Sequence, residues 1–186
     1  LTNIMIKGVI FDRDGTLIKH VPYLSKSEDV VLIPGVIDAC KQLMNKGIKL
    51  FIATNQSGIA RGYFTEADYN RIEKHVEDLL KSNHVLIEKT YVCPFHPVHG
   101  IGIYKQDSFD RKPNPGMLKK VISDYGIPAN EMCMVGDNKT DIEAAKSIQM
   151  TSVLVRTGLG GQFEDCNPDF IANDLLDAVE QFILDL

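Results

Sequence analysis

The segment Val9-Ile10-Phe11-Asp12-Arg13-Asp14-Gly15-Thr16 decides the fold that we expect for this chain. Residues 4–11 are few and almost continuously apolar, which predicts a strand buried on both faces of a sheet. Two acids, Asp12 and Asp14, follow at once, and a chain that stays extended points their side chains the same way. Carboxylates that share a pocket repel one another and favour a bound cation or a shared proton. The alternative is a turn or a helix cap, because Asp and Gly are common in turns.

The rest of the chain alternates short apolar stretches with stretches of helical periodicity. Further strands are predicted at residues 48–53, 90–92, 132–135 and 152–155. The clearest helix begins with Thr65 and Asp68 in a capping-box arrangement, and its apolar stripe consists of Tyr69, Ile72, Val76, Leu79 and Leu80. Other helix starts are predicted at Ile33-Pro34-Gly35, Asn114-Pro115, Thr140 and Asp174. This alternation predicts an α/β fold with a doubly wound, mostly parallel sheet and helices on both faces.

Length and composition exclude several classes of protein. The chain has 186 residues, which favours one domain over residues 1–186. Its 20 basic and 25 acidic residues give a net charge of −5 without a basic stripe, so we expect no nucleic-acid partner. No stretch approaches the roughly 18 apolar residues of a membrane span, so no membrane partner is expected. The four cysteines form no CxxC pair and the first residues do not resemble a secretory leader, which favours a cytoplasmic location.

Polar groups follow the predicted strands at the edge of the sheet where doubly wound proteins bind ligands. Thr54-Asn55-Gln56-Ser57-Gly58 follows the second strand and offers hydroxyl, amide and backbone N–H groups that suit phosphate oxygens. Arg111-Lys112-Pro113 supplies two cations before a helix, and Gly136-Asp137 follows the fourth strand, with Asp141 close behind. Each segment alone also fits a turn, a solvated pair or a helix cap. If the strands are neighbours, all of these groups converge in one crevice.

Taken in order, these segments resemble the motifs of the haloacid dehalogenase-like phosphatases over residues 5–157. Asp12-Arg13-Asp14-Gly15-Thr16 matches the first motif, and the other three are matched by Thr54, by Lys112 and by Gly136-Asp137 through Asp141. Residues 54–62, with Phe64-Thr65 and Arg111-Lys112-Pro113, are similar more narrowly to the D-glycero-D-manno-heptose 1,7-bisphosphate phosphatases. The phosphatase that acts on histidinol phosphate is a close cousin and stays open as an alternative.

The resemblance implies a phosphate monoester hydrolase that works through an aspartyl-phosphate. It implies Asp12 as the nucleophile, Asp14 as general acid and then base, and Thr54 and Lys112 as groups that stabilise the transferring phosphoryl group. A Mg²⁺ ion would be held by the Asp12 side chain, the Asp14 backbone carbonyl and the Asp137 side chain. Substrate contacts are expected from Arg13, Asn55, Gln56, Ser57 and Arg111. Residues 20–23 are further candidates, and no role is assigned to Asn138 or Asp141.

Many relatives in the resembled family carry a lid domain after the first or second motif. Here 42 positions separate Asp12 from Thr54 and 58 separate Thr54 from Lys112, and both stretches must also supply scaffold helices and strands. The resemblance therefore implies no large cap domain and only short loops around the site. Such a site suits a small phosphorylated sugar or another metabolite, bound by a monomer or a small homo-oligomer.

The irregular stretch at residues 93–111 resembles a zinc loop that has lost most of its ligands. In the resembled family, a Cys-x-His pair and a Cys-x-Cys pair bind structural zinc. Cys93 is present, but Phe95 stands two positions later and the second pair reads Ser108-Phe109-Asp110. We therefore expect no bound zinc. The alternative is a rebuilt site of altered geometry that uses Cys93, His96, His99 and Asp110.

A phosphoacceptor switch of the receiver type is the alternative from another functional class. Receiver domains also combine acids, Thr and Lys on an α/β sheet around magnesium. Their acid pair precedes a later strand that carries the phosphoacceptor, whereas Asp12-Arg13-Asp14 follows the first strand here. Repeated turnover of a simple phosphate monoester would separate an enzyme from such a switch.

Overall fold

The computed structural model describes residues 5–186, which build one sheet of six strands. All neighbouring strands pair in parallel, in the order β3-β2-β1-β4-β5-β6. The strands are β1 (Gly8–Phe11), β2 (Lys49–Asn55), β3 (Lys89–Cys93), β4 (Met132–Gly136), β5 (Thr151–Val155) and β6 (Phe170–Ala172). The strand order reverses between β1 and β4, which is the switch point where ligands bind in such sheets. The doubly wound parallel fold expected from the sequence is confirmed.

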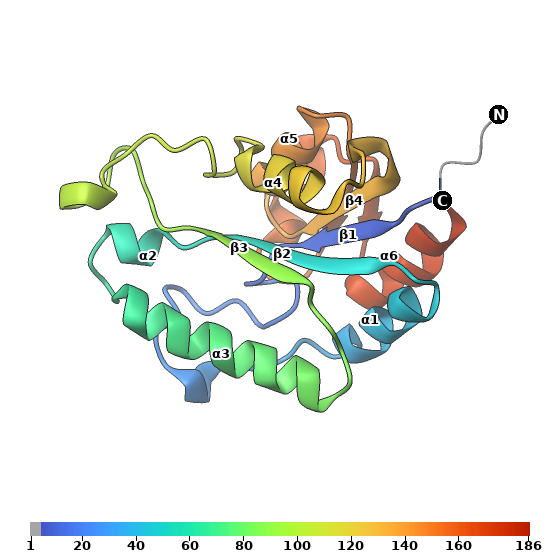
Figure 1. Ribbon diagram of the computed structural model, residues 1–186, viewed down its shortest axis with the longest axis horizontal. Helices are drawn as coiled ribbons and strands as arrows, with labels where there is room; N and C mark the ends of the chain where they lie inside the picture. Colours follow the sequence, from blue (N-terminus) through green and yellow to red (C-terminus); the bar gives the residue numbers. More distant parts are fainter. Residues whose placement is uncertain (1–4) are drawn as a thin grey trace.

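Helices cover both faces of the sheet (Figure 1). The α-helices are α1 (Val36–Asn45), α2 (Ser57–Ala60), α3 (Glu66–Ser82), α4 (Gly116–Tyr125), α5 (Lys139–Lys146) and α6 (Leu175–Gln181). Helices α1, α3 and α6 pack on one face, whereas α4 and α5 pack on the other. Short 3-10 helices lie in the connections at Ser27–Asp29, Gly102–Tyr104, Ala129–Glu131, Gly160–Gln162, Glu164–Cys166 and Ile183–Asp185. Among residues 5–186, no helix combines the length and the apolar composition that a membrane crossing requires.

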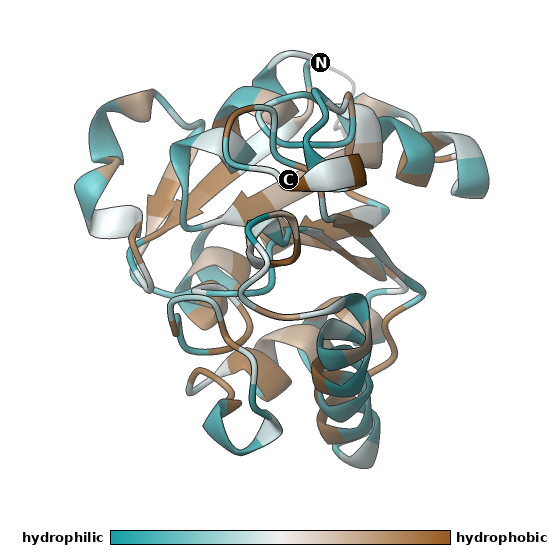
Figure 2. Cartoon of the chain, turned by 90° about the vertical axis from the view of Figure 1, so that its left-hand side faces the viewer, coloured by the Kyte–Doolittle hydropathy of each residue, from teal (hydrophilic) through white to brown (hydrophobic). Residues whose placement is uncertain are grey.

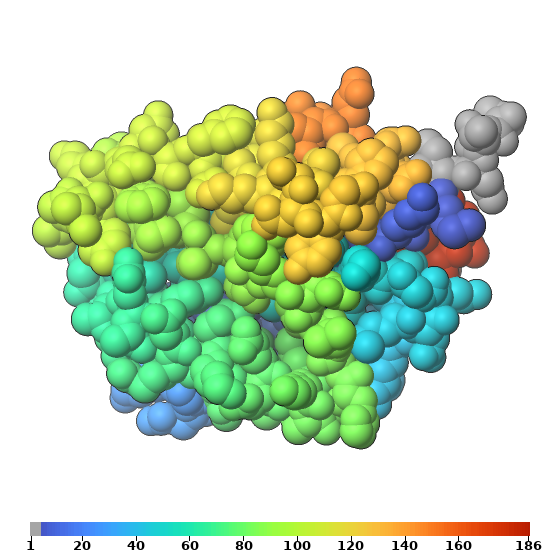
Figure 3. All heavy atoms as spheres, viewed as in Figure 1, coloured from blue at the N-terminus to red at the C-terminus, as the bar shows by residue number. Residues whose placement is uncertain are grey.

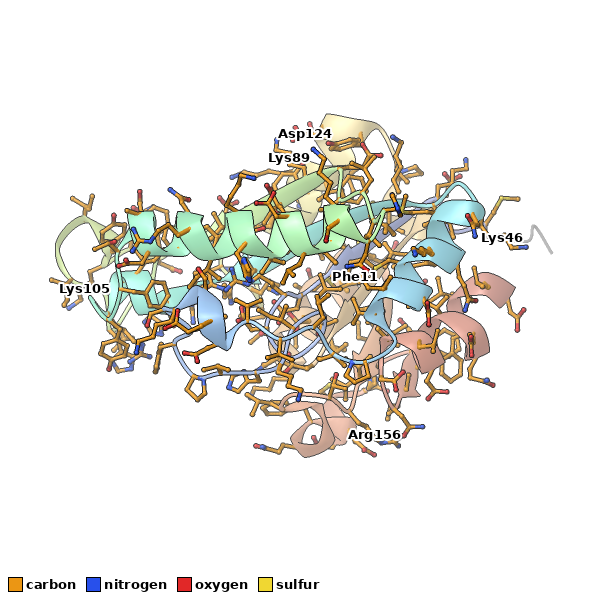
Figure 4. All side chains as sticks on the ribbon, turned by 90° about the horizontal axis from the view of Figure 1, so that it is seen from below. Phe11, Lys46, Lys89, Lys105, Asp124 and Arg156 are labelled. Carbon is orange, nitrogen blue, oxygen red and sulfur yellow. The ribbon has the colours of Figure 1, made fainter. Side chains whose placement is uncertain are left out.

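The two hydrophobic clusters are separated by the sheet because successive strand residues point to opposite faces. Val9 and Phe11 of β1 belong to the cluster under α1 and α3, where Phe11 is labelled in Figure 4. Ile10 lies between them in sequence and packs on the other side with Phe51 and Met134. All four residues of β1 are buried, and the strands form the brown centre of Figure 2. Double-sided burial explains why β1 was predictable as an uninterrupted apolar run.

Two helix starts differ from the predictions by one or two residues. Helix α5 is capped by Asn138 and not by Thr140: the Asn138 side chain accepts from the Thr140 backbone N–H, and Asp141 accepts from the N–H of Asn138. Helix α4 has Pro115 at its N-cap because the Asn114 side chain donates instead to the Ser108 carbonyl. The capping box of Thr65 with Asp68 at the start of α3 is confirmed.

The strand boundaries also differ in places from the predictions. Strand β1 begins at Gly8, four residues later than expected, and the predicted first residue, Ile4, lies outside the described part of the chain. Strand β6 was not predicted, because three residues at the sheet edge are too few to show a two-residue alternation. Neither difference alters the order of the four inner strands.

The segment between β3 and α4 leaves the sheet without adding a further strand. It folds back onto α2 and the start of α3: the Ile101 N–H donates to the Ala60 carbonyl, and the Tyr104 hydroxyl donates to Glu66. Figure 3 shows this segment, in yellow-green, lying against the teal residues that follow β2. The inserts are loops of this kind and not a domain, as predicted for a protein without a large cap.

Candidate active site

A cavity of about 280 Å³ opens at the switch point between β1 and β4. Its walls come from the end of β2, from residues that follow β1, β2, β4 and β5, and from the segment before α4. The structure therefore brings most of the sequence-predicted site residues together, since the carboxyl ends of parallel strands share one edge. The predicted residues that line the cavity are Asp12, Asp14, His20, Thr54, Asn55, Ser57, Arg111, Lys112 and Asp137.

Three carboxylates gather on one side of this cavity. Asp12, Asp137 and Asp141 each offer an oxygen within 4.8 Å of the other two, and Asp137 and Asp141 are buried. Burial raises the pKa of Asp137 to about 8, with further contributions from the charges of Asp12 and Asp141. Burial also raises the pKa of Asp141 to about 7. Burial thus opposes the charged form of this cluster, and a divalent cation such as Mg²⁺, which prefers hard oxygen ligands, would favour that form.

Lys112 is the buried cation beside this cluster. Its Nζ lies 2.9 Å from Asp12 Oδ1 and 2.6 Å from Asp141 Oδ1, and it donates to the Ala53 carbonyl at 2.6 Å. Burial alone would lower the pKa of Lys112, but the two carboxylates raise it above its usual value. Asn55 fixes the Lys112 backbone, donating to its carbonyl and accepting from its N–H. The site thus contains a fixed positive charge next to Asp12, where anionic oxygens would be stabilised.

Arg13 was expected to contact substrate, but it does not line the cavity. Its side chain is fully buried beneath the cavity, where the guanidinium pairs with Asp14 and with Glu73 of α3. The physical reason is local: the chain bends at residue 13, whose carbonyl accepts from the Leu17 and Ile18 N–H groups, and the Arg13 side chain leaves this turn toward α3 and not into the cavity. Gln56 is also buried and donates to Asp14 Oδ2 at 2.9 Å and to Thr54 Oγ1 at 2.8 Å. It lines only a smaller adjoining pocket of about 160 Å³.

Comparison with known proteins identifies the family. A family model described as HAD-hydrolase-like matches residues 109–178. The D-glycero-beta-D-manno-heptose-1,7-bisphosphate 7-phosphatase of Haemophilus ducreyi is 40% identical over 176 residues, covering 93% of this chain and 96% of that relative. The enzyme of the same name from Escherichia coli K12 is 37% identical over 174 residues, covering 92% of this chain and 91% of that relative. This chain belongs to the same HAD-like phosphatase family.

A solved structure agrees with this assignment over the whole phosphatase fold. The D,D-heptose 1,7-bisphosphate phosphatase from B. bronchiseptica, a crystal structure of a complex with magnesium and phosphate, superposes with a TM-score of 0.86. It is 28% identical to this phosphatase, and the match covers 97% of this chain and 100% of that one. The fold described above is therefore that of a phosphatase of this family.

Sequence reasoning missed the loop that follows β5 in this phosphatase. The Leu159 N–H donates to Asp137 Oδ2 at 2.8 Å, and the Thr157 hydroxyl donates to the Gly15 carbonyl at 2.7 Å. Gly158 lies between them with φ of +59°. The loop thus braces Asp137 and the turn after β1. The rule that singled out residues after the first four strands would have found it, had it been applied to the fifth.

We predict that Gly158→Ala lowers kcat of this phosphatase by about 10-fold or more, because small displacements of reacting groups are costly. A Cβ at position 158 would lie 2.1 Å from Asp137 Oδ2 and 2.7 Å from the Gly15 Cα, and the positive φ disfavours any L side chain. Steady-state kinetics checks the expectation. Gly161→Ala is the matched control, since a Cβ there would meet no atom within 4 Å. Equal activity in the two variants would show that the loop does not position Asp137.

The segment that resembles a zinc loop is packed around Cys93. Cys93 is fully buried, and burial raises the pKa of its thiol, which favours the neutral form. His96 Nδ1 accepts from the backbone N–H groups of Val98 and His99, and Asp110 pairs with Lys120. The geometry suits Cys93 as a small apolar residue beneath the loop.

We predict that the purified phosphatase contains no stoichiometric zinc and that Cys93→Ser lowers the melting temperature only modestly. A structural zinc supplies folding energy only through a complete ligand set, and Phe95 cannot serve as a ligand. Elemental analysis and thermal melting check this prediction. Cys133→Ser, at another fully buried cysteine, measures the ordinary cost of placing a hydroxyl in this core. Near one zinc per chain, with a far larger loss for Cys93→Ser than for Cys133→Ser, would mean that the loop has rebuilt a metal site.

Proposed function

We propose that this phosphatase removes the 7-phosphate of D-glycero-β-D-manno-heptose 1,7-bisphosphate through an aspartyl-phosphate on Asp12, with Mg²⁺ as cofactor. The observation that carries the proposal is the juxtaposition of Asp12, the buried Lys112 and the Asp137 carboxylate in one cavity. Such a cavity holds a nucleophile, a fixed cation and a metal-binding oxygen set within reach of one phosphoryl group. The names of the similar relatives support the choice of substrate.

The proposed metal ligands are the Asp12 side chain, the Asp14 backbone carbonyl and the Asp137 side chain. Asp141 completes the carboxylate cluster but is engaged by Lys112 and by the Asn138 N–H, which fits a supporting role. When bound, Mg²⁺ would offset the repulsion between the Asp12 carboxylate and a dianionic phosphate. Without the ion, ionised carboxylates and a dianionic phosphate would face each other as like charges in a poorly solvated cavity, which is unfavourable.

In the first proposed step, an Asp12 oxygen attacks phosphorus while the phosphorus–oxygen bond to the sugar breaks. Asp14 donates its proton to the departing alkoxide, and Thr54 and Lys112 hold the phosphoryl oxygens. In the second step, a water molecule attacks phosphorus, Asp14 accepts its proton and Asp12 departs with the electron pair of its bond to phosphorus. Inorganic phosphate leaves, and Asp12 and Asp14 return to their starting states.

The rest of the substrate would lie toward the mouth of the cavity, where Asn55, Ser57 and Arg111 are half-buried. Arg111 donates through one nitrogen to the Phe95 carbonyl, which orients its guanidinium at the rim. We propose that its remaining donors contact the non-reacting phosphate, because guanidinium groups bind phosphate through two parallel hydrogen bonds.

The test is a kinetic screen of sugar phosphates, sugar bisphosphates and histidinol phosphate, with phosphorus NMR to identify which phosphate is released. We expect kcat/KM to be highest for D-glycero-β-D-manno-heptose 1,7-bisphosphate, with loss of the 7-phosphate and retention of the 1-phosphate. A higher kcat/KM for histidinol phosphate would overturn the substrate assignment and favour the cousin activity. Phosphorylation of the protein without repeated turnover of any monoester would instead indicate a receiver-like switch.

A further inference from the structure

A buried chain of polar contacts runs from β3 through α3 to the proposed acid and base, Asp14. Arg13 Nε donates to Asp14 Oδ2 at 3.1 Å, and Arg13 Nη1 donates to Glu73 Oε2 at 3.1 Å. Glu73 in turn accepts from the Tyr69 hydroxyl at 3.2 Å and from Thr90 Oγ1 of β3 at 2.8 Å. Each member is buried or half-buried, so solvent does not offer an easy substitute for these contacts.

The guanidinium of Arg13 has little freedom in this setting. Its side chain is 1% exposed, and its Cζ lies 5.4 Å from the centre of the Tyr69 ring. The charges of Asp14 and Glu73 raise its pKa above the usual value although burial acts in the opposite direction, so it stays charged. Among the residues that the structure describes, Asp14 and Glu73 are the acids paired with it. Glu73 therefore binds one end of the Arg13 guanidinium, and the other end of that guanidinium binds Asp14.

Stability alone does not account for this arrangement. A buried ion pair is often no more stable than well-packed apolar residues of the same volume, because both charges lose their hydration. Helix α3 already buries Ile72, Val76 and Leu80 against the sheet, and an apolar residue at position 73 would extend that stripe. What a carboxylate adds at that position is a fixed direction for the planar fork of Arg13. That fork, with Gln56, fixes the plane of the Asp14 carboxylate in the cavity wall.

We propose that Glu73 and Arg13 are positioning residues that hold the Asp14 carboxylate in the orientation needed to donate a proton to the leaving alkoxide. The inference rests on the proposed role of Asp14 as general acid. Glu73 acts through Arg13 and does not touch the substrate. Proton transfer requires hydrogen-bond distance between the acid and the leaving oxygen. An Asp14 carboxyl group that is rotated out of place would therefore no longer protonate the leaving alkoxide.

The test compares two substrates that differ in their need for an acid. The leaving group of a sugar phosphate is a strongly basic alkoxide. The leaving group of 4-nitrophenyl phosphate is a stable phenolate, which departs without protonation. The quantity is kcat/KM, which covers only the steps up to departure of the leaving group. We expect Glu73→Gln to lower kcat/KM for the sugar phosphate by about 10-fold or more, consistent with the usual size of general acid catalysis. For 4-nitrophenyl phosphate we expect a change of less than about 3-fold, since that substrate does not use the acid.

Matched variants separate positioning from loss of folding. Glu77→Gln makes the same change one turn later on α3 at an exposed position. It is expected to leave kcat/KM for both substrates unchanged. Tyr69→Phe removes only the hydroxyl that donates to Glu73 and leaves no unpaired buried charge, so it remains informative if Glu73→Gln does not fold. We expect Tyr69→Phe to show the same selectivity with a smaller loss.

Asp14→Asn sets the scale of the experiment. The proposal is supported if Asp14→Asn lowers kcat/KM strongly for the sugar phosphate alone, and if Glu73→Gln and Tyr69→Phe show the same pattern to a smaller extent. The positioning role is overturned if Asp14→Asn shows this selectivity but Glu73→Gln and Tyr69→Phe lower kcat/KM equally for both substrates. The proposed function would then stay intact. Equal losses in Asp14→Asn itself overturn the acid role of Asp14, and the positioning role with it.

Discussion

Asp12→Asn is expected to fold like the parent protein and to retain less than about 1% of its phosphatase activity, because loss of the covalent route costs several kcal/mol of transition-state stabilisation. Asp12 directly follows β1, lies in the cavity wall and is held by the charged Lys112 at 2.9 Å. An amide at this position cannot attack phosphorus. Initial rates with the best substrate of the screen, together with circular dichroism and thermal melting, measure the two parts of this expectation.

The control for this variant is Asp38→Asn, an identical change at an exposed position on α1. It is expected to keep full activity, which excludes contamination or handling as the source of a loss. Turnover by Asp12→Asn well above 1% of the parent rate, in a preparation free of other phosphatases, would mean that another group carries the phosphoryl transfer.

Removal of divalent cations is expected to abolish activity, and addition of Mg²⁺ is expected to restore it. The physical reason is the gathering of Asp12, Asp137 and Asp141, whose oxygens lie within 4.8 Å of one another in a buried site facing a dianionic substrate. A bound ion also stabilises the folded state by mass action, so Mg²⁺ should raise the melting temperature in a concentration-dependent way. Activity assays in chelator and thermal melting with Mg²⁺ titration provide the two readouts.

The matched variant for the metal experiment is Asp137→Asn, which removes one carboxylate charge and keeps the shape of the side chain. It is expected to shift the Mg²⁺ dependence of both activity and melting to higher concentrations. Asp38→Asn serves again as the unaffected control. Full activity of the parent protein in excess chelator would contradict the metal assignment.

The sheet and the cavity were predictable because both follow from short-range rules. The strand at β1 is an apolar run that needs no partner to be recognised, and the two acids directly after it lie at the edge of the sheet where ligands bind. Thr54 and Asp137 follow from the same rule applied to β2 and β4, whereas Lys112 was singled out as one of two cations before a helix and received its role from the family resemblance. The structure places all of them around one cavity.

Arg13 and Glu73 were misjudged or missed for a different reason, since their partners are distant in sequence. The chain bends at residue 13 directly after β1, and this bend, which the sequence pattern does not show, takes the Arg13 side chain beneath the cavity to Glu73. Glu73 lies beside the apolar stripe of α3, next to Ile72, where an acid is unexpected without a partner. Nothing in the local sequence names that partner, because Arg13 and Glu73 are 60 residues apart and meet only in the folded chain.

The covalent mechanism on Asp12 is tested by trapping the phosphorylated enzyme during turnover. Acid quenching of a steady-state reaction, followed by borohydride reduction, converts an aspartyl-phosphate to homoserine, and peptide mass spectrometry locates it in the sequence. We predict homoserine at position 12 in the parent protein with substrate, and none without substrate or in Asp12→Asn. An unmodified Asp12 during full turnover, with the phosphoryl group trapped on another side chain or on none, would contradict this mechanism.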